Sequence, residues 1–304
     1  MVRALWKDMV TALVLGFLLP GVVTNMAVNC SPPEPPQFRS PVSVRTGEWV
    51  REMELDDYIA GVVLAEMPAS FEEEALKAQS VAARTYTRKA MEGGKHGDGS
   101  ICTDSTCCQG YISREDYLLR GGKEENADRV RSACAATEDL VLVYEGELID
   151  ATYFSSAGGE TESALEVWGG DVPYLQSVSS PEGEAVLSET LRFSPEEFSK
   201  LLGRALTGSP ETWFTLVTYT EGGGVASMTI GGQAYSGTEL RRLLGLRSTA
   251  FTVAADRNSI TVATRGYGHR VGMSQQGANA MAQEGSTYQE ILAHYYPGTT
   301  LTAR

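Results

Sequence analysis

The sequence predicts an α+β fold in which a helical part packs on antiparallel β structure. Two amphipathic helical segments occupy residues 54–91. From Leu140 onward, short runs rich in β-branched and aromatic residues follow, bounded by Gly, Ser, Asp and Asn. Because helices come first and strands follow, without a regular alternation, the pattern favours α+β over a parallel α/β fold.

The N-terminal segment predicts a membrane helix. Residues 9–28 carry no charged side chain, and a helix of that length crosses about 30 Å of hydrocarbon. Arg3 and Lys7 precede it, which places the N-terminus in the cytoplasm and the remainder outside. We therefore expect residues 1–30 to anchor a single-pass protein in the cell membrane. A cleaved signal peptide is the alternative, because the strongest apolar stretch, residues 12–19, is short.

The remaining chain divides by composition. Residues 31–49 are rich in proline and predict an extended spacer. Residues 50–304 are expected to form one extracytoplasmic domain. Within it, residues 190–264 are a candidate inserted subdomain.

The first predicted helix spans Glu54–Ala65. Leu55, Ile59 and Val62 recur on one helical face. Pro68 disfavours helical geometry at the residue before it, so the helix is expected to end near that point.

The second predicted helix spans residues 71–91. Ser70 and Glu73 have the spacing of a capping box, which predicts the start of this helix. Small residues recur along one of its sides and predict a seam for a close neighbour: Ala75, Ala78 and Ala82. A loop rich in Gly, Cys, Asp and Ser is expected over residues 93–110.

The later elements are predicted from short apolar runs. Strands are expected at residues 140–144, 149–156, 212–219, 225–230, 251–255 and 259–264. Helices are expected at residues 195–206, 238–244, 275–284 and 288–295.

Composition excludes several classes of protein. The 304 residues carry a formal net charge of −14, which argues against a nucleic-acid binder, since such a protein needs a basic surface. Neither a G-x-x-x-x-G-K-[ST] loop nor a G-x-G-x-x-G opening a βαβ unit is present, so no phosphate cradle is expected. The sequence has only 3 His and 5 Cys, so each of them can be considered individually as a candidate metal ligand.

Five segments, taken in order, resemble the stage II sporulation protein D family, which includes amidase enhancers. They are LDDYI to VLAEMP (55–68), EALKAQSVAARTY (74–86), CTDSTCCQGY (102–111), SSAGGET (155–161, running on to Tyr174-Leu175) and GHRVGMSQQGA (268–278, followed by ILAHYYP at 291–297). Together they span about residues 55–300. The anchor and spacer also suit the sporulation member.

The resemblance implies a lytic transglycosylase that cleaves peptidoglycan between N-acetylmuramic acid and N-acetylglucosamine during forespore engulfment. It also implies a substrate of glycan strands already stripped of their peptides, with a cell-wall amidase and a membrane protein of the engulfment machinery as partners. The outer domain would then lie on the mother-cell side of the intermembrane space. The alternative within the same family is an amidase enhancer that binds peptidoglycan without cleaving glycan.

Glu66 matches the family's catalytic glutamate. One carboxyl group suffices for this reaction, because it protonates the leaving oxygen while the 6-hydroxyl of the sugar attacks C1. A hydrolase would add a second carboxylate. The expected position of Glu66 at a helix C-terminus, with partial burial, predicts a raised pKa.

The Cys-rich loop resembles the zinc site of the sporulation members, with His96, Cys102 and Cys108 as the ligands. Thiolate and imidazole groups suit Zn²⁺, and we expect a structural role. Cys107 stands where the family has a histidine, and adjacent cysteines are not expected both to point at one ion. A disulfide from Cys102 to Cys107 or Cys108 is the alternative. Cys134 is predicted to be a buried free thiol.

The remaining site candidates are expected to line a glycan groove. Their hydroxyl, amide and glycine groups suit an uncharged ligand. They are Gln79, Arg84, Tyr153, Ser155, Ser156, Gly158, Gly159, Thr161, His269, Ser274 and Gln275. Arg84 has a structural alternative, through contacts to backbone or carboxylates. Arg270 and Gln276 replace a family glycine and tryptophan, which puts details of the groove in question.

Overall fold

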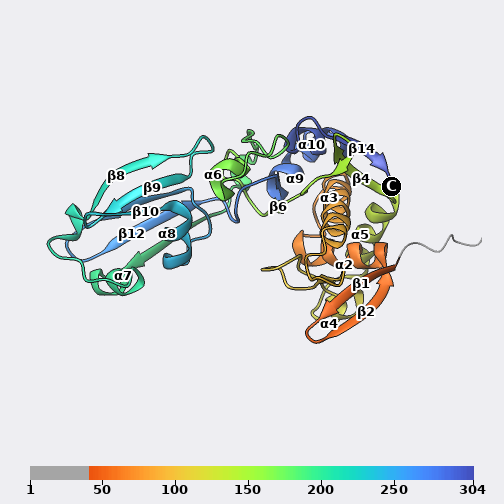
Figure 1. Ribbon diagram of the computed structural model, residues 1–304, viewed down its shortest axis with the longest axis horizontal. Coiled ribbons are helices and arrows are strands. Elements are labelled where there is room, and N and C mark those ends of the chain that lie inside the picture. Colours follow the sequence, from red (N-terminus) through yellow and green to blue (C-terminus); the bar gives the residue numbers. More distant parts are fainter. Residues whose placement is uncertain (1–40) are drawn as a thin grey trace, which may run out of the picture. The chain divides into compact units, whose positions relative to one another are not determined.

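The computed structural model describes residues 41–304, and these residues cluster as one unit (Figure 1). The predicted anchor and residues 31–40 of the spacer lie outside the described residues. Within residues 41–304, no helix is long and apolar enough to cross a membrane. The α+β class predicted from the sequence is confirmed for the described chain.

The described chain begins with a β-hairpin. Strand β1 (Pro41–Thr46) pairs antiparallel with β2 (Trp49–Glu54), and β3 (Ile101–Cys102) pairs parallel with β1. The prediction that the spacer extends to residue 49 is therefore wrong from residue 41. Val42 and Val44 alternate into the core, and Gly47 takes the positive φ that the turn requires.

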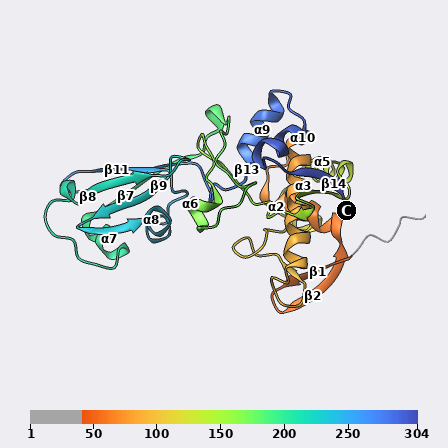
Figure 2. The same cartoon turned by 45° about the horizontal axis from the view of Figure 1, so that its top comes forward.

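Helix α3 (Glu73–Glu92) lies at the centre of the first hydrophobic core. Helices α2 (Leu55–Glu66), α5 (Glu124–Ala136), α9 (Gln275–Gln283) and α10 (Tyr288–Tyr295) pack against or beside it, as Figure 2 shows. The three alanines of the predicted seam are fully buried there. The short helix α4 (Arg114–Leu119) contacts α2 and α5.

The predicted capping box at Ser70 is wrong. The N-cap of α3 is Glu72, which makes no side-chain cap bond. Instead, the backbone N–H of Glu72 donates to Asn279 of α9 at 2.8 Å. A turn from Pro68 to Phe71 occupies the residues that the capping box would have used.

A small sheet completes this first core. Strand β4 (Leu140–Tyr144) pairs with β5 (Glu147–Leu148) and with β14 (Thr300–Ala303). Strand β6 (Tyr153–Phe154) pairs parallel with β13 (Met273–Ser274), directly before α9. This pairing brings two segments that are far apart in sequence to one place. Helix α6 (Ala164–Trp168) follows β6.

A second hydrophobic core is formed by two three-stranded sheets. One has the order β11-β12-β7, from Phe251–Ala255, Ile260–Arg265 and Ser188–Phe193; the other is β10-β9-β8, from Gln233–Ser236, Val225–Ile230 and Phe214–Tyr219. Helices α7 (Pro195–Leu201) and α8 (Gly237–Leu244) pack with them. Two short 3₁₀ helices lie at Gly183–Ala185 and Pro210–Thr212.

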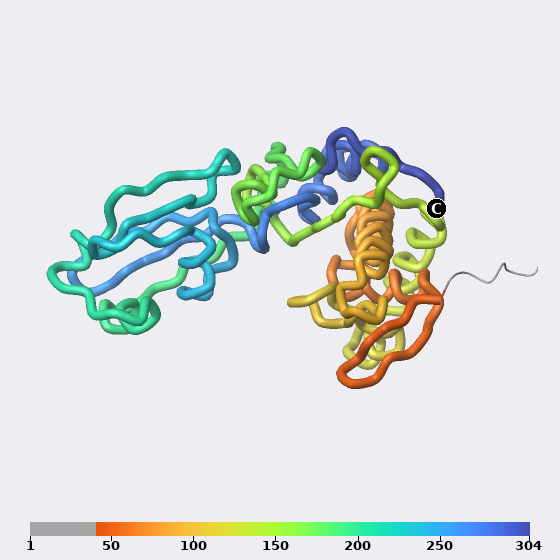
Figure 3. The backbone as a smooth tube through the Cα atoms, viewed as in Figure 1, coloured from red at the N-terminus to blue at the C-terminus, as the bar shows by residue number. Residues whose placement is uncertain are grey.

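Some predicted bounds were too long. Helix α7 ends at Leu201 rather than at residue 206, because Gly203 adopts φ 70°, the conformation that ends helices. Of the predicted strand at 149–156, only Tyr153–Phe154 forms a strand, and Ser156 makes an isolated bridge with Tyr267. The backbone tube in Figure 3 can be followed through both regions.

Candidate functional site

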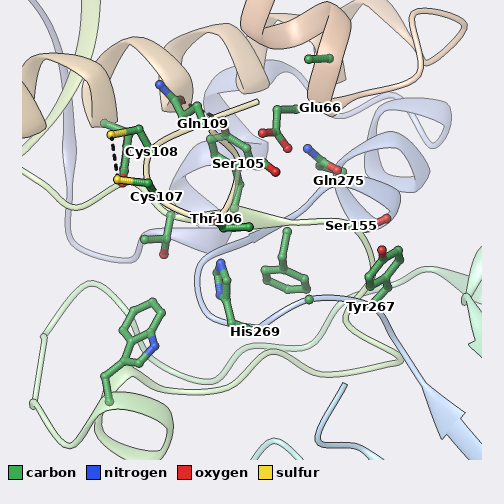
Figure 4. Close-up of a pocket in the computed structure, with 17 residues that line it drawn as sticks. Glu66, Ser105, Thr106, Cys107, Cys108, Gln109, Ser155, Tyr267, His269 and Gln275 are labelled. Atoms are coloured by element: carbon green, nitrogen blue, oxygen red, sulfur yellow. Dashed lines mark hydrogen bonds between the residues drawn. The ribbon is translucent and has the colours of Figure 1, made fainter. Parts of the chain in front are cut away.

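A cleft of about 830 Å³ contains the main candidate residues (Figure 4). Seven segments of the chain line it: Ala65, Glu66, Tyr86, Ser105, Thr106, Cys107, Cys108, Gln109, Thr152, Tyr153, Phe154, Ser155, Trp168, Tyr267, Gly268, His269 and Gln275. Glu66 is the one acidic or basic side chain among these lining residues, apart from the single histidine. The cleft thus offers hydroxyl and amide groups around one carboxyl group.

Glu66 is the last residue of α2 and is partly buried. The helix ends there because Met67 is extended before Pro68. Burial raises the pKa of the Glu66 carboxyl, and a hydrogen bond that its Oε1 accepts from the N–H of Gly110 opposes that rise. The predicted direction of the pKa is therefore confirmed, with desolvation as the main cause.

Glycine at position 110 allows the carboxyl group to keep this position. A Cβ atom at that position would lie 2.8 Å from Oε1 of Glu66. The Cys-rich loop therefore reaches Glu66 by its backbone alone and fixes the orientation of the carboxyl group.

Glu66 lies at the junction of two hollows. A second hollow of about 350 Å³ is lined by Leu64, Ala65, Glu66, Met67, Pro68, Phe71, Ser155, Gln275 and Gln276. Both hollows are lined by Ala65, Glu66, Ser155 and Gln275. An extended ligand can therefore occupy space on both sides of the carboxyl group. Gln276 lines the second hollow, so its departure from the family pattern does fall in the groove.

Tyr153 is held beside Glu66 by a chain of hydrogen bonds. Its Oη donates to Oε1 of Gln109 at 2.8 Å, and Nε2 of Gln109 donates to Oγ1 of Thr87 at 2.8 Å. Burial, and then the negative charge of Glu66, keep the pKa of Tyr153 well above its usual value. Tyr153 is therefore a fixed, neutral phenol. Gln109, which sequence reasoning missed, orients it.

Glu182, which was also not predicted from the sequence, holds two of the predicted groove segments together by hydrogen bonds. Its buried carboxylate accepts hydrogen bonds from Oγ of Ser156 and Oγ of Ser274, both at 2.5 Å. It also accepts bonds from the N–H of Ala157 and from Oγ of Ser180. The Ser155–Gly158 loop and the N-cap of α9 are thereby tied to one side chain.

The groove role predicted for Ser156 and Ser274 is wrong, because both hydroxyls are fully buried and point at Glu182. Thr161 is also fully buried, and its hydroxyl accepts from the N–H of Val178. Gly158 and Gly159 do not line the cleft either. These residues shape the wall, whereas Ser155 reaches the ligand space.

Arg84 is not in the groove. It is fully buried, pairs with Asp56 at 3.2 Å, and donates to the carbonyls of Cys134 and Thr137. The structural alternative is therefore the correct one. Gln79 is also fully buried outside the cleft lining; its Oε1 lies 3.4 Å from Nε2 of Gln275. Gln79 thus supports Gln275 and is not exposed to ligand.

Four potential metal ligands converge in the Cys-rich loop. The ligand atoms of His96, Cys102, Cys107 and Cys108 all lie within 4.8 Å of one another. Cys107 Sγ is 3.9 Å from Cys108 Sγ, and His96 Nε2 is 3.3 Å from Cys108 Sγ. Two thiolates on a tetrahedral zinc with bonds of about 2.3 Å lie about 3.8 Å apart. The donor set and its spacing fit zinc.

Cys107 corrects one expectation, because the two adjacent cysteines do point to the same place. No disulfide joins the described cysteines: Cys102, Cys107, Cys108 and Cys134 are free thiols. Cys134 is buried as predicted, and burial raises its pKa to about 11.

His269 lines the cleft as a neutral ring. Its Nδ1 accepts from the N–H of Val271 at 3.1 Å. Burial and the nearby charge of Arg241 lower its pKa to about 4, against a smaller opposing effect from a hydrogen bond with the Tyr153 backbone. Trp168 and Tyr267 line the same wall, and neither was predicted. Tyr267 directly precedes the matched segment that begins at Gly268, whereas Trp168 lies in no recognisable motif.

Arg270 faces away from the cleft. It is 2% exposed and pairs with the equally buried Glu162 at 2.9 Å. It also donates to the carbonyls of Ala157 and Gly222. Its φ of 67° lies in the left-handed region, which is the conformation that glycine adopts most readily. Arg270 therefore alters the wall behind the groove without touching the ligand space.

Comparison with known proteins identifies the class of protein. A sequence model described as "Stage II sporulation protein" matches residues 45–144. The chain is 38% identical to "Stage II sporulation protein D" of Bacillus amyloliquefaciens, over 88% of this chain and 81% of that protein. It is 39% identical to "Stage II sporulation protein D" of Bacillus subtilis, over 86% of this chain and 80% of that protein.

The chain belongs to the stage II sporulation protein D family, a family of sporulation proteins. It is also 33% identical to the "Amidase enhancer" of Bacillus subtilis, over 81% of this chain and 40% of that protein. The resemblance described from the five sequence segments is thereby confirmed.

Proposed function

We propose that this protein is a lytic transglycosylase that cleaves peptidoglycan glycan strands during sporulation, with Glu66 as the single general acid and base. The observation that carries the proposal is a partly buried carboxyl group of raised pKa at the junction of two hollows. The hollows on either side of Glu66 suit a chain cut at an internal bond.

The reaction needs nothing beyond Glu66 and the sugar. The protonated carboxyl group donates its proton to the glycosidic oxygen, and the bond from that oxygen to C1 of N-acetylmuramic acid breaks. The 6-hydroxyl of the same sugar bonds to C1, and the Glu66 carboxylate takes its proton. The products are a 1,6-anhydro end and a free hydroxyl on the leaving sugar, so no water is consumed. The absence of a second carboxylate from the cleft lining agrees with this scheme.

We propose further that His96, Cys102, Cys107 and Cys108 hold a structural zinc ion. Four protein ligands close a tetrahedral shell and leave no position for a reactive water. The ion would fix the loop that presents Gly110 to Glu66 and Gln109 to Tyr153. Its proposed contribution is the shape of the site and not the chemistry.

The first prediction concerns Glu66→Gln. The purified full chain is incubated with peptide-stripped glycan strands and with intact sacculi, and the products are analysed by mass spectrometry. The wild type is expected to release 1,6-anhydro ends. The Glu66→Gln variant is expected to lose at least about 10³-fold in rate, because an amide cannot supply the proton. Its carbonyl still accepts from Gly110, so the melting temperature should not fall.

Glu92→Gln is the matched control, since Glu92 is an exposed carboxylate at the end of the neighbouring helix α3. It should cleave as the wild type does. The raised pKa of Glu66 also predicts that the rate falls as pH rises through that pKa, because the acid form is lost. Reducing ends in place of anhydro ends would indicate a hydrolase, and wild-type turnover by the Glu66→Gln variant would remove Glu66 from the mechanism.

The second candidate function is amidase enhancement, which the 33% identity to a protein of that name favours. In that case the chain raises the activity of a cell-wall amidase on sacculi without cutting glycan. The Glu66→Gln variant distinguishes the two functions: an enhancer stimulates the amidase equally with either side chain at this position, and neither form yields anhydro ends.

A further inference from the structure

Two aromatic side chains that line the cleft leave about half of their surface exposed. Trp168 is 52% exposed and Tyr267 is 46% exposed, and both line the cleft that contains Glu66. The mechanism proposed above uses neither of them. Exposed large rings inside a concave site are typical of ligand contacts, since a ring without such a role gains free energy by burial.

Trp168 is held in place by the fold. It is the last residue of α6, and Gly169 ends that helix in the left-handed conformation. Its ring lies 5.4 Å from the ring of His269. His269 is fixed in turn by the Val271 N–H and by Phe154, whose ring is 5.5 Å away. The exposed indole is therefore positioned before any ligand arrives.

Tyr267 is also positioned in advance. Its backbone forms a bridge with Ser156, which joins it to the loop tied down by Glu182. The guanidinium of Arg247 lies 5.2 Å from the centre of the Tyr267 ring and is itself paired with Glu189 at 3.0 Å. The close-up in Figure 4 shows Tyr267 and His269 on the same side of the cleft, across from Glu66.

The chemistry of the cleft selects the kind of ligand. A sugar ring has an apolar face of C–H groups and a rim of hydroxyls. The C–H face suits the negative face of an aromatic ring. The rim suits the polar groups that line the cleft, among them the hydroxyls of Ser105, Thr106 and Ser155. A phosphate or nucleotide would require free cationic groups, and the lining holds no lysine or arginine.

We propose that Trp168 and Tyr267 form an aromatic subsite that stacks on an N-acetylhexosamine ring of the glycan, across the cleft from Glu66. This inference rests on the proposed function for the class of ligand. The subsite binds one sugar of the strand and thereby places a glycosidic bond at the carboxyl group.

The test measures binding without cleavage. The full chain carrying Glu66→Gln is titrated with a tetramer of N-acetylglucosamine and with peptide-stripped glycan strands, by calorimetry and by tryptophan fluorescence. Adding Trp168→Ala or Tyr267→Ala is expected to weaken binding tenfold or more. Tyr267→Phe is expected to retain most of the affinity, because the ring remains.

Trp49→Ala is the matched control, since Trp49 is 82% exposed and lies on β2, outside the cleft lining. It should bind as the parent does. Trp168→Phe should remove most of the fluorescence change on binding, whereas Trp49→Phe should keep it. Unchanged melting temperatures show that a loss of affinity is local.

Equal affinity of the parent and of the variants carrying Trp168→Ala and Tyr267→Ala would overturn the subsite, and so would the absence of any binding by the parent. These outcomes are separate from those of the proposed function. If the wild type cleaves no glycan but binding depends on both rings, the subsite stands and the transglycosylase fails. If the wild type cleaves glycan but the two substitutions do not affect binding, the transglycosylase stands and the subsite fails.

Discussion

At the scale of single residues, side chains that never touch the ligand space shape the site. Arg270 combines a left-handed backbone with a buried ion pair to Glu162. The left-handed conformation costs a residue with a Cβ about 1–2 kcal/mol. Breaking a buried pair by removing one partner costs about 3–5 kcal/mol, because the other charge stays buried. The ion pair should therefore outweigh the backbone cost.

Arg270→Gly tests this balance. We expect the free energy of unfolding to fall by about 2–3 kcal/mol, even though glycine relieves the backbone. Urea unfolding followed by circular dichroism measures it. The double variant with Glu162→Gln should recover part of the loss, because the unpaired buried charge is gone. A stability gain in the single variant would show that backbone strain dominates.

At the scale of elements, the Cys-rich loop connects the metal candidates to the acid. Residues 93–110 contain little regular structure, yet Gly110 contacts Glu66 and Gln109 holds Tyr153. A loop of this kind depends on local cross-links for its order, because it buries few apolar side chains. If it holds zinc, the ion provides that order.

Removal of the metal should therefore disturb the site. We expect the purified chain to contain one zinc per molecule, and Cys107→Ser to lower the zinc content and the melting temperature together. A chelator should act in the same way on the wild type and increase proteolysis within the loop. Plasma emission spectroscopy, thermal melts and mass spectrometry of the fragments measure these effects.

Cys134→Ala is the control for that experiment. Cys134 is buried against Ser80, and it is not among the clustered ligands. Its variant should keep full zinc content, although it loses some packing. Zinc-free wild-type protein that melts at the same temperature with and without chelator would contradict the metal site.

At the scale of the whole described chain, two hydrophobic cores are present. One surrounds α3, and the other is formed by residues between Phe198 and Val262. The two ends of the segment that forms the second core lie side by side. Ser188 pairs with Arg265, and the N–H of Gly266 donates to the carbonyl of Leu187. This arrangement is compatible with the inserted subdomain expected at residues 190–264, which remains a prediction.

Hydrogen exchange tests whether the two cores open separately. Phe198→Ala and Leu76→Ala each remove a fully buried side chain, one from each core. Each should cost about 2–5 kcal/mol. We expect Phe198→Ala to reduce amide protection mainly within residues 188–265, and Leu76→Ala mainly in α2, α3 and α5. Equal loss of protection everywhere in both variants would indicate a single cooperative unit.

Prediction from sequence succeeded where the signal is local. The periodicity of Leu55, Ile59 and Val62 identified α2, and Pro68 fixed its end. Prediction failed where contacts with residues far away in the sequence determine the position or role of a side chain. Ser70 has the spacing of a cap, but Asn279 takes the position beside the start of α3. Arg84 was predicted as a groove residue on a helix, but its partners lie on α2 and at the C-terminal end of α5.

From the sequence alone, we could predict the α+β class, the positions of most helices, the family and the carboxyl group at the end of α2. These follow from periodicity, from proline and glycine, and from matched segments, all of which are local. Three features became visible only in the folded chain: which polar residues face the cleft, the position of Cys107 beside the other three candidate ligands, and the positions of Trp168 and Tyr267 in the cleft lining. The burial of a side chain and the convergence of several side chains on one site depend on contacts between residues far apart in the chain. A local sequence pattern does not contain that information.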